Sequence, residues 1–317
     1  MMFSRRNFIK LTALSTGVFL FDCGSTRRSV KKSAMYNNSI DTLILDFDGT
    51  LTNIEKEAKP YVEGFCKCLG RELKLSQSEI ETYWNEARAK ILKTPEKYGW
   101  ELDGIIVASA TSDPIMTCYP ITDEILSKLG TNLSEQERRA LLAKLYLENY
   151  PKMSESFKEG VDEFLSEVWD LFEGNVYVVT NSSPDKVEKK ISHLHSDHSR
   201  ITIIGGAKKY VVVNDWEAVP QTITISGLER QVYLRRQHYG NILDKIMKEQ
   251  NTNASRITVI GDIWELDLAL PQYLGMNIGF IPNKTTPQYE KEVVLNYKSG
   301  FIANGLEEAY KELVKKK

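Results

Sequence analysis

Short apolar runs alternate with longer amphipathic stretches along most of this chain. The apolar runs lie at residues 42–45, 176–179, 201–204, 257–260 and 278–281, and each is typical of a strand buried on both faces. Between them, apolar residues recur every three or four positions, which is the period of a helix with one buried face. Strands that alternate with helices from residue 158 onward predict an α/β fold with a Rossmann-like parallel sheet.

Residues 55–157 have a different, mostly helical pattern. Their apolar residues form three stripes at helical spacing, within 61–73, 80–91 and 141–146, and Ser134 is placed to cap the third helix. We therefore predict a helical domain at 55–157, inserted into an α/β core made of residues 41–54 and 158–317. The apolar stretch 104–110 inside the insertion is not assigned to a helix or a strand by its pattern.

The N-terminus indicates export. Two arginines precede an apolar run of about 14 residues, which is typical of a secretory signal and too short for most membrane spans. Ser4-Arg5-Arg6-Asn7-Phe8-Ile9-Lys10 resembles the twin-arginine signal. We expect a signal peptide at 1–23, a flexible tether at 24–40 and a location in the periplasm or cell envelope.

Cys23 closes the apolar run and resembles the acylated cysteine of bacterial lipoproteins, although Asp22 before it is not small. Lipid attachment, simple cleavage and an uncleaved anchor stay open, as does a cytoplasmic protein with a chance basic and apolar start. Membrane contact is expected only through this segment. The other cysteines, Cys66, Cys68 and Cys118, lack the spacing of a zinc site and are expected to be buried thiols, although export also permits a disulfide.

Composition narrows the class of protein. Of 317 residues, 42% are hydrophobic and 26% charged, which is ordinary for a soluble globular protein. The net charge of −2 gives no electrostatic case for nucleic-acid binding. The sequence does not indicate an oligomeric state.

Polar residues follow three of the predicted strands at the point where each strand ends. They are Asp46 and Asp48, then Thr180 and Asn181, and finally Asp262 with Asp267. The carboxyl ends of parallel strands meet at one edge of a sheet, where ligands bind. Carboxylates gathered there repel one another unless a cation neutralises them, and oxygen ligands suit Mg²⁺. The sequence thus predicts a magnesium site that handles an anionic substrate.

These residues also carry a family resemblance. Asp46-Phe47-Asp48-Gly49-Thr50-Leu51 resembles the first motif of the haloacid dehalogenase-like (HAD) hydrolase superfamily, and Val178-Val179-Thr180-Asn181 resembles the second. The segment from Gly261-Asp262 to Asp267 is similar to the acidic fourth motif. Order and spacing agree over residues 41–281.

The resemblance implies a role for each matched residue. Asp46 would be the nucleophile that forms an aspartyl-phosphate, and Asp48 the general acid and base. Thr180 and Asn181 would bind the phosphoryl group. Mg²⁺ would be held by Asp46, the Asp48 backbone carbonyl and Asp262, with Asp267 as a further ligand or a partner that orients the ligands. Alternatively, Asp267 is a charge at a helix N-terminus.

The third motif of the family supplies a Lys or Arg, and this sequence lacks the usual Lys-Pro pair. Arg236 has the expected position before the helix that leads to the fourth motif and is preferred. Lys208 or Lys209 comes next, followed by Arg235. Each could instead be a solvated surface charge.

Asp48 also narrows the reaction that the resemblance implies. Dehalogenases of the superfamily, and most phosphonate-cleaving members, lack an aspartate at this position, whereas the transporting ATPases have threonine. The helical insertion resembles a cap domain, which favours a small phosphorylated metabolite over a phosphoprotein. The expected function is a Mg²⁺-dependent phosphatase. A phosphomutase, another HAD-type hydrolase and a non-enzymatic, envelope-tethered binding protein are the alternatives, although the last would be expected to have lost Asp46, Asp48 or Asp262.

Replacing Arg5 and Arg6 together by lysine should retain the protein in the cytoplasm of a bacterial host, because the arginine pair is what the twin-arginine pattern requires. Fractionation followed by immunoblotting compares the variant with the wild type. A wild-type protein found in the cytoplasm, or equal distributions for the two proteins, would contradict the export prediction.

Overall fold

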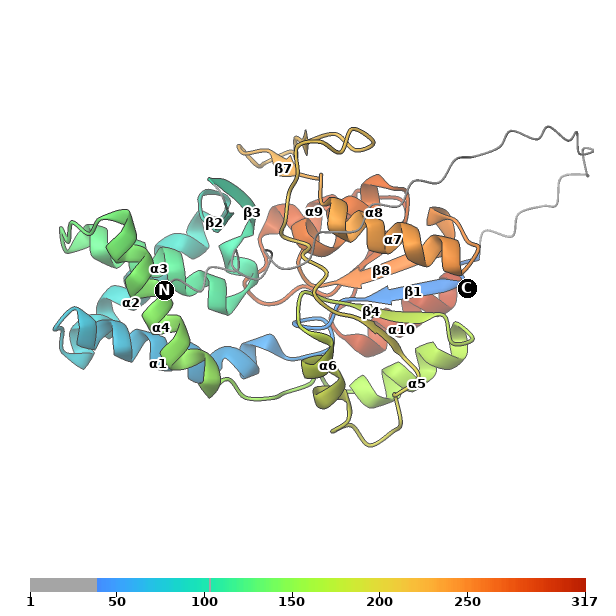
Figure 1. Cartoon of the computed structure of the whole chain (residues 1–317), viewed down its shortest axis with the longest axis horizontal. Coiled ribbons are helices and arrows are strands. Elements are labelled where there is room, and N and C mark those ends of the chain that lie inside the picture. Colours follow the sequence, from blue (N-terminus) through green and yellow to red (C-terminus); the bar gives the residue numbers. More distant parts are fainter. Residues whose placement is uncertain (1–38, 103) are drawn as a thin grey trace, which may run out of the picture.

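The computed structural model describes residues 39–102 and 104–317. The predictions for the signal peptide, Cys23 and most of the tether lie outside these residues. In Figure 1 a sheet with helices on both sides occupies one end of the molecule and a helical unit occupies the other. No helix in the described part of the chain is both long and apolar enough to cross a membrane.

The core is a six-stranded sheet in the order β10-β9-β8-β1-β4-β5, and every neighbouring pair is parallel. Its strands are β1 (Thr42–Leu45), β4 (Val176–Val179), β5 (Thr202–Ile204), β8 (Ile257–Gly261), β9 (Asn277–Phe280) and β10 (Gly300–Ile302). The central strands β1, β4 and β8 are buried along their whole length. Their continuous apolar runs are what a sheet covered on both faces requires. The predicted α/β, Rossmann-like core is confirmed.

Helices cover both faces of this sheet (Figure 1). Side chains of α5 (Val161–Leu171), α6 (Pro184–Ile191) and α10 (Leu306–Lys316) share one hydrophobic cluster with Leu43 and Leu45 of β1. On the opposite face, Ile44 packs in a second cluster with α7 (Gln237–Glu249), α8 (Ala269–Tyr273) and α9 (Gln288–Leu295). Alternate residues of β1 thus belong to different cores, which fixes the register of the strand.

Between β1 and α5 the chain forms a helical unit with a hydrophobic cluster of its own, and we call this unit the insert. It contains α1 (Ile54–Glu72), α2 (Gln77–Lys93), α3 (Pro114–Lys128) and α4 (Glu135–Asn149). Short helices lie at Pro95–Lys97, Ala110–Ser112 and Tyr150–Lys152. Ser134 caps α4 in a reciprocal capping box with Glu137. Cys66, Cys68 and Cys118 are free thiols buried in the insert.

The stretch 104–110, which the sequence pattern left unassigned, is part of a hairpin in the insert. Strand β2 (Gly99–Leu102) pairs with β3 (Ile105–Ser109) in the antiparallel sense. A second small hairpin, β6 (Thr222–Ile223) with β7 (Val232–Tyr233), lies in the excursion between β5 and α7. Because β3 contacts β7, the two hairpins join the insert to the core.

Truncation of Leu165 should destabilise the core. Leu165 of α5 is completely buried against the sheet, so Leu165→Ala is expected to lower the free energy of unfolding by about 2–5 kcal/mol. Leu295→Ala is the control, because this leucine is 68% exposed and its loss should change the stability by less than about 0.5 kcal/mol. Urea unfolding followed by circular dichroism measures both, and equal losses would contradict the assigned core.

Candidate functional site

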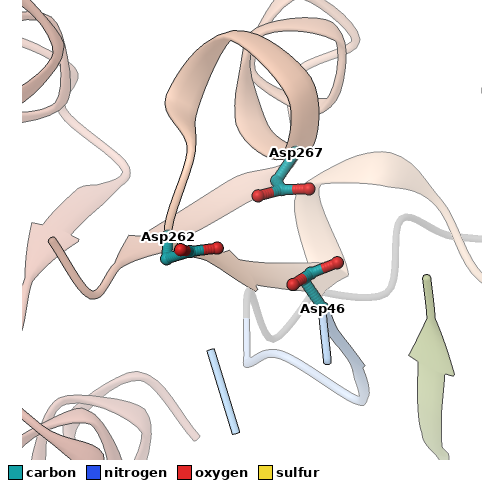
Figure 2. Close-up of side chains that lie close together, drawn as sticks. All are labelled: Asp46, Asp262 and Asp267. Carbon is teal, nitrogen blue, oxygen red and sulfur yellow. The ribbon is translucent and has the colours of Figure 1, made fainter. Parts of the chain in front are cut away.

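Three buried carboxylates meet at the C-terminal edge of the sheet (Figure 2). Asp46 follows β1, Asp262 follows β8, and Asp267 lies in the short π-helix η6 (Trp264–Leu268). One oxygen of each lies within 4.8 Å of the others. The structure thus brings Asp46 together with Asp262 and Asp267, which lie more than 200 positions later in the sequence, and these residues were predicted to meet.

Two glycines permit this close approach. Gly49 has φ +91°, and a Cβ atom there would lie 2.1 Å from Oδ2 of Asp262. At Gly261 a Cβ atom would lie 2.4 Å from Cβ of Asp267. A side chain at either position would therefore push the carboxylates apart.

Lys209 is the cation at the centre of the cluster. Its Nζ lies 2.7 Å from Oδ1 of Asp46 and 2.8 Å from Oδ1 of Asp267, and the residue is only 1% exposed. Burial alone would lower the pKa of the ammonium, but Asp267 and Asp46 outweigh that effect and raise the pKa. Lys209 is therefore charged and neutralises part of the acidic cluster.

The loop that carries Lys209 is held by a hydrogen bond to Asn181. The side-chain oxygen of Asn181 accepts a hydrogen bond from the Lys209 backbone N–H at 2.8 Å, so Asn181 positions the lysine. Lys208, next to it, is half-buried and has φ +48°, which marks a tight turn. The turn separates the two lysines, and Lys209 is the one that reaches the carboxylates.

Arg236 and Arg235 lie elsewhere, which changes the preference that the sequence gave to Arg236. The guanidinium of Arg236 is fully buried and donates to the backbone carbonyls of Lys209 and Val107, the latter at 2.7 Å. Burial lowers its pKa to about 10. Arg235 donates to the carbonyl of Val219 at 2.8 Å. Among the described residues, Lys209 is the one of the four candidate cations that bonds the carboxylates.

Arg236 nevertheless has a role beside the site. Val107 belongs to β3 of the insert, whereas Lys209 belongs to the core, so one guanidinium ties the insert to the lysine loop. The sequence could not show this contact, because it depends on the path of the chain between β5 and α7 and on how the insert packs against the core.

Asp48 lies apart from the three buried carboxylates and faces the end of β4. Its Oδ2 accepts a hydrogen bond from the Ser182 hydroxyl at 2.6 Å and lies 3.5 Å from the Thr180 hydroxyl. Thr180 in turn accepts from the Ser182 backbone N–H at 3.1 Å. Ser182 was not singled out from the sequence, although its place just after Thr180 and Asn181 offered the signal. The expectation that the Asp48 backbone carbonyl binds metal stays a prediction.

Two further lysines, Lys190 and Lys158, lie near the aspartates of the site. Nζ of Lys190, on α6, lies 2.8 Å from the buried carboxylate of Glu57 and 3.7 Å from Asp48. Lys158 is largely buried where the chain re-enters the core, so burial lowers its pKa, while Asp262 and Glu55 act in the opposite direction. The sequence analysis missed both lysines, because lysines on amphipathic or linking segments are usually solvated.

The electrostatics of the cluster favour a cation. Burial raises the pKa of Asp46 to about 7, with Lys209 opposing and Asp267 adding to the rise. The pKa of Asp262 is raised well above its ordinary value by burial, and then by Asp267 and Asp46. One lysine cannot balance three carboxylates, and all the donors are oxygens. The residues therefore fit a hard divalent cation such as Mg²⁺, which would stabilise the ionised forms.

No family model and no curated protein matches this sequence. Similar solved structures include YfnB of Bacillus subtilis, described as a putative HAD-hydrolase bound to magnesium, with 15% identity and a TM-score of 0.47 over 87% of this chain and 99% of that one. A predicted phosphoglycolate phosphatase from Haemophilus somnus has 14% identity and a TM-score of 0.47 over the same shares. The L-2-haloacid dehalogenase PA0810 has 10% identity and a TM-score of 0.35 over 86% and 99%. Likeness at these levels carries no conclusion about activity.

Binding of Mg²⁺ should depend on pH. The pKa of Asp46 is about 7, so below that pH the cation must displace a proton. We expect an affinity roughly tenfold higher at pH 8 than at pH 6 for this one proton, measured by isothermal titration calorimetry. Asp262→Asn should lose most of the binding at both pH values. Equal affinity at pH 6 and pH 8, or unchanged binding by Asp262→Asn, would contradict the assigned site.

Proposed function

We propose that this protein is a Mg²⁺-dependent phosphatase of the HAD superfamily that hydrolyses a small phosphomonoester through an aspartyl-phosphate. One observation carries the proposal. A buried carboxylate, Asp46, is bonded by Lys209 and lies beside Asp262 at the end of a parallel sheet, with a second carboxylate, Asp48, close by in the chain. To these four residues we assign the roles of nucleophile, cation, metal-binding group and acid/base, in that order.

In the first step, an oxygen of Asp46 attacks phosphorus and the bond from phosphorus to the ester oxygen breaks. The protonated carboxyl group of Asp48 gives its proton to the leaving oxygen, so the product leaves as a neutral alcohol. The hydroxyl group of Ser182 holds the Asp48 side chain in place for this transfer.

In the second step, water attacks phosphorus and the bond to Asp46 breaks, which releases inorganic phosphate. Asp48, now a carboxylate, takes a proton from the water and regains its starting form. The two steps together convert an ester and water into an alcohol and phosphate, and both aspartates end as they began.

The remaining residues of the site stabilise the negative charge of the phosphoryl group. Mg²⁺, when bound by Asp46 and Asp262, would neutralise negative charge on the phosphoryl group. Lys209 presents a fixed positive charge beside the nucleophile, and Asp267 keeps it there. Asn181 holds the backbone of Lys209, and its own N–H and the Thr180 hydroxyl are the donors we assign to the phosphoryl oxygens.

The insert supports a small substrate. Its residue Glu57 binds Lys190, which also lies near Asp48, and Val107 of β3 binds Arg236. These contacts support the assignment of the insert as a cap over the strand ends, and such caps exclude water and large partners. With the N-terminal signal pattern, we further propose that the enzyme acts outside the cytoplasm, where a phosphomutase would lack its usual sugar phosphates.

Asp46→Asn should abolish the activity. The amide is not a nucleophile, so we expect Mg²⁺-dependent release of phosphate from a generic aryl phosphate to fall by at least about a thousandfold. Asp244→Asn on the exposed side of α7 is the matched control and should retain wild-type rates. Phosphate release is measured with and without a chelator. A wild-type protein without Mg²⁺-dependent activity, or a fully active Asp46→Asn, would refute the proposal.

A further inference from the structure

The insert contains an apolar cavity of about 260 Å³. It lies between β2, α3 and α4, and none of its lining side chains is charged. They are Trp100, Met116, Tyr119, Leu142, Ala143, Tyr146 and Leu147. Aromatic rings and flexible apolar side chains thus make up most of the wall, which is the composition of a site for an apolar ligand group.

One side of the cavity reaches the lysine loop of the core. The ring of Trp100 packs against the ring of Tyr210, with centroids 4.9 Å apart and planes at 35°. Tyr210 directly follows Lys209, whose ammonium bonds Asp46. The lining residue Trp100 therefore contacts the residue next to the cation of the proposed phosphoryl site.

A second lining residue, Tyr146, is linked to the segment that follows β4. Tyr146 stacks on Tyr150, with centroids 4.8 Å apart, and the Lys186 ammonium lies 5.1 Å from the centroid of the Tyr150 ring. Lys186 belongs to α6, which begins just after Thr180 and Ser182. Two lining residues, Trp100 and Tyr146, are thus linked through Tyr210 and Tyr150 to the two core segments that carry the proposed site.

We propose that this cavity takes the leaving group of the substrate and that this group is aromatic. The inference rests on the proposed function and names the class of substrate, an aromatic phosphomonoester. A cavity of roughly 150 Å³ holds benzene, so 260 Å³ has room for a substituted ring. Trp100, Tyr119 and Tyr146 offer ring partners and Met116 a polarisable sulfur, which favour a flat aromatic group over an alkyl chain.

A second cavity, between the insert and the loop after β9, provides a contrast. It has about 360 Å³ and lies between α1, α2, α3 and the loop after β9. Its wall combines apolar residues with the charged residues Glu55, Lys59, Glu63, Arg88 and Lys284. A polyol or sugar leaving group would suit this wall, whereas it would lose hydrogen bonds with water in the apolar cavity without replacing them. The first cavity therefore differs from the second in having no charged side chain in its wall, and it is the one that favours an apolar leaving group.

The test compares benzyl phosphate with glycerol 3-phosphate, because both release an alcohol and differ mainly in the apolarity of that group. We expect wild type to have the higher kcat/KM on benzyl phosphate. Leu142→Gln places an amide in the apolar cavity and should reduce this preference about tenfold, mainly through KM. Leu92→Gln is the matched control, because Leu92 is a half-buried leucine that lines the second cavity, and it should keep the preference.

Binding is measured separately from hydrolysis, with benzylphosphonate and methylphosphonate as non-hydrolysable probes in isothermal titration calorimetry. Tighter binding of benzylphosphonate that weakens in Leu142→Gln supports the cavity even if no phosphate is released, and the proposed function alone would then fail. Hydrolysis without a benzyl preference, or a preference unchanged in Leu142→Gln, overturns the cavity assignment and leaves the phosphatase intact. Met116→Gln, which also lines the cavity, replaces Leu142→Gln if that variant does not fold.

Discussion

The pairing of the Lys209 ammonium with Asp46 and Asp267 is the interaction on which the site depends. Carboxylates crowded into a buried space repel one another, and a charge taken out of water is costly unless it is closely paired. The two short bonds of Lys209 reduce the repulsion between the carboxylates and pair the buried ammonium closely. Gly49 and Gly261 then allow Asp262 and Asp267 to lie close to their neighbours, so the local backbone is adapted to this charge cluster.

The support for Lys209 comes from both structural units. Within the core, Asn181 binds its N–H. Its carbonyl accepts from Arg236, which also binds Val107 of the insert. A rearrangement of the insert would therefore change the position of Lys209 and, through it, the ion pair with Asp46. The core supplies the carboxylates, whereas contacts from both the core and the insert fix the position of the cation.

The parts of the structure that could be predicted are those set by local pattern. Continuous apolar runs identified β1, β4 and β8, and residues at strand ends must meet in a parallel sheet, so Asp46 and Asp262 could be placed from the sequence. Lys209 could not be chosen over Arg236, because a cation's position depends on the path of an irregular loop. Strand β10 was missed since it is three residues long and begins with a glycine.

Long-range side-chain contacts could not be predicted from the sequence either. Glu57 and Lys190 are 133 residues apart, and each belongs to an amphipathic helix on which a charge is normally solvated. Only the packing of the insert against α6 reveals that Glu57 is completely buried and paired. Geometry of this kind depends on tertiary packing, which no periodicity in one segment encodes.

The chain enters and leaves the insert at one point. Thr52 and Phe157 form an antiparallel bridge, and the Lys158 N–H donates to the Leu51 carbonyl at 2.9 Å. Because the two connections are adjacent, the insert attaches to the sheet at a single position. The order of the strands therefore does not depend on the structure of the insert. An insert of another length or fold could therefore occupy this position, and change which molecules fit against the strand ends, without moving Asp46 or Asp262.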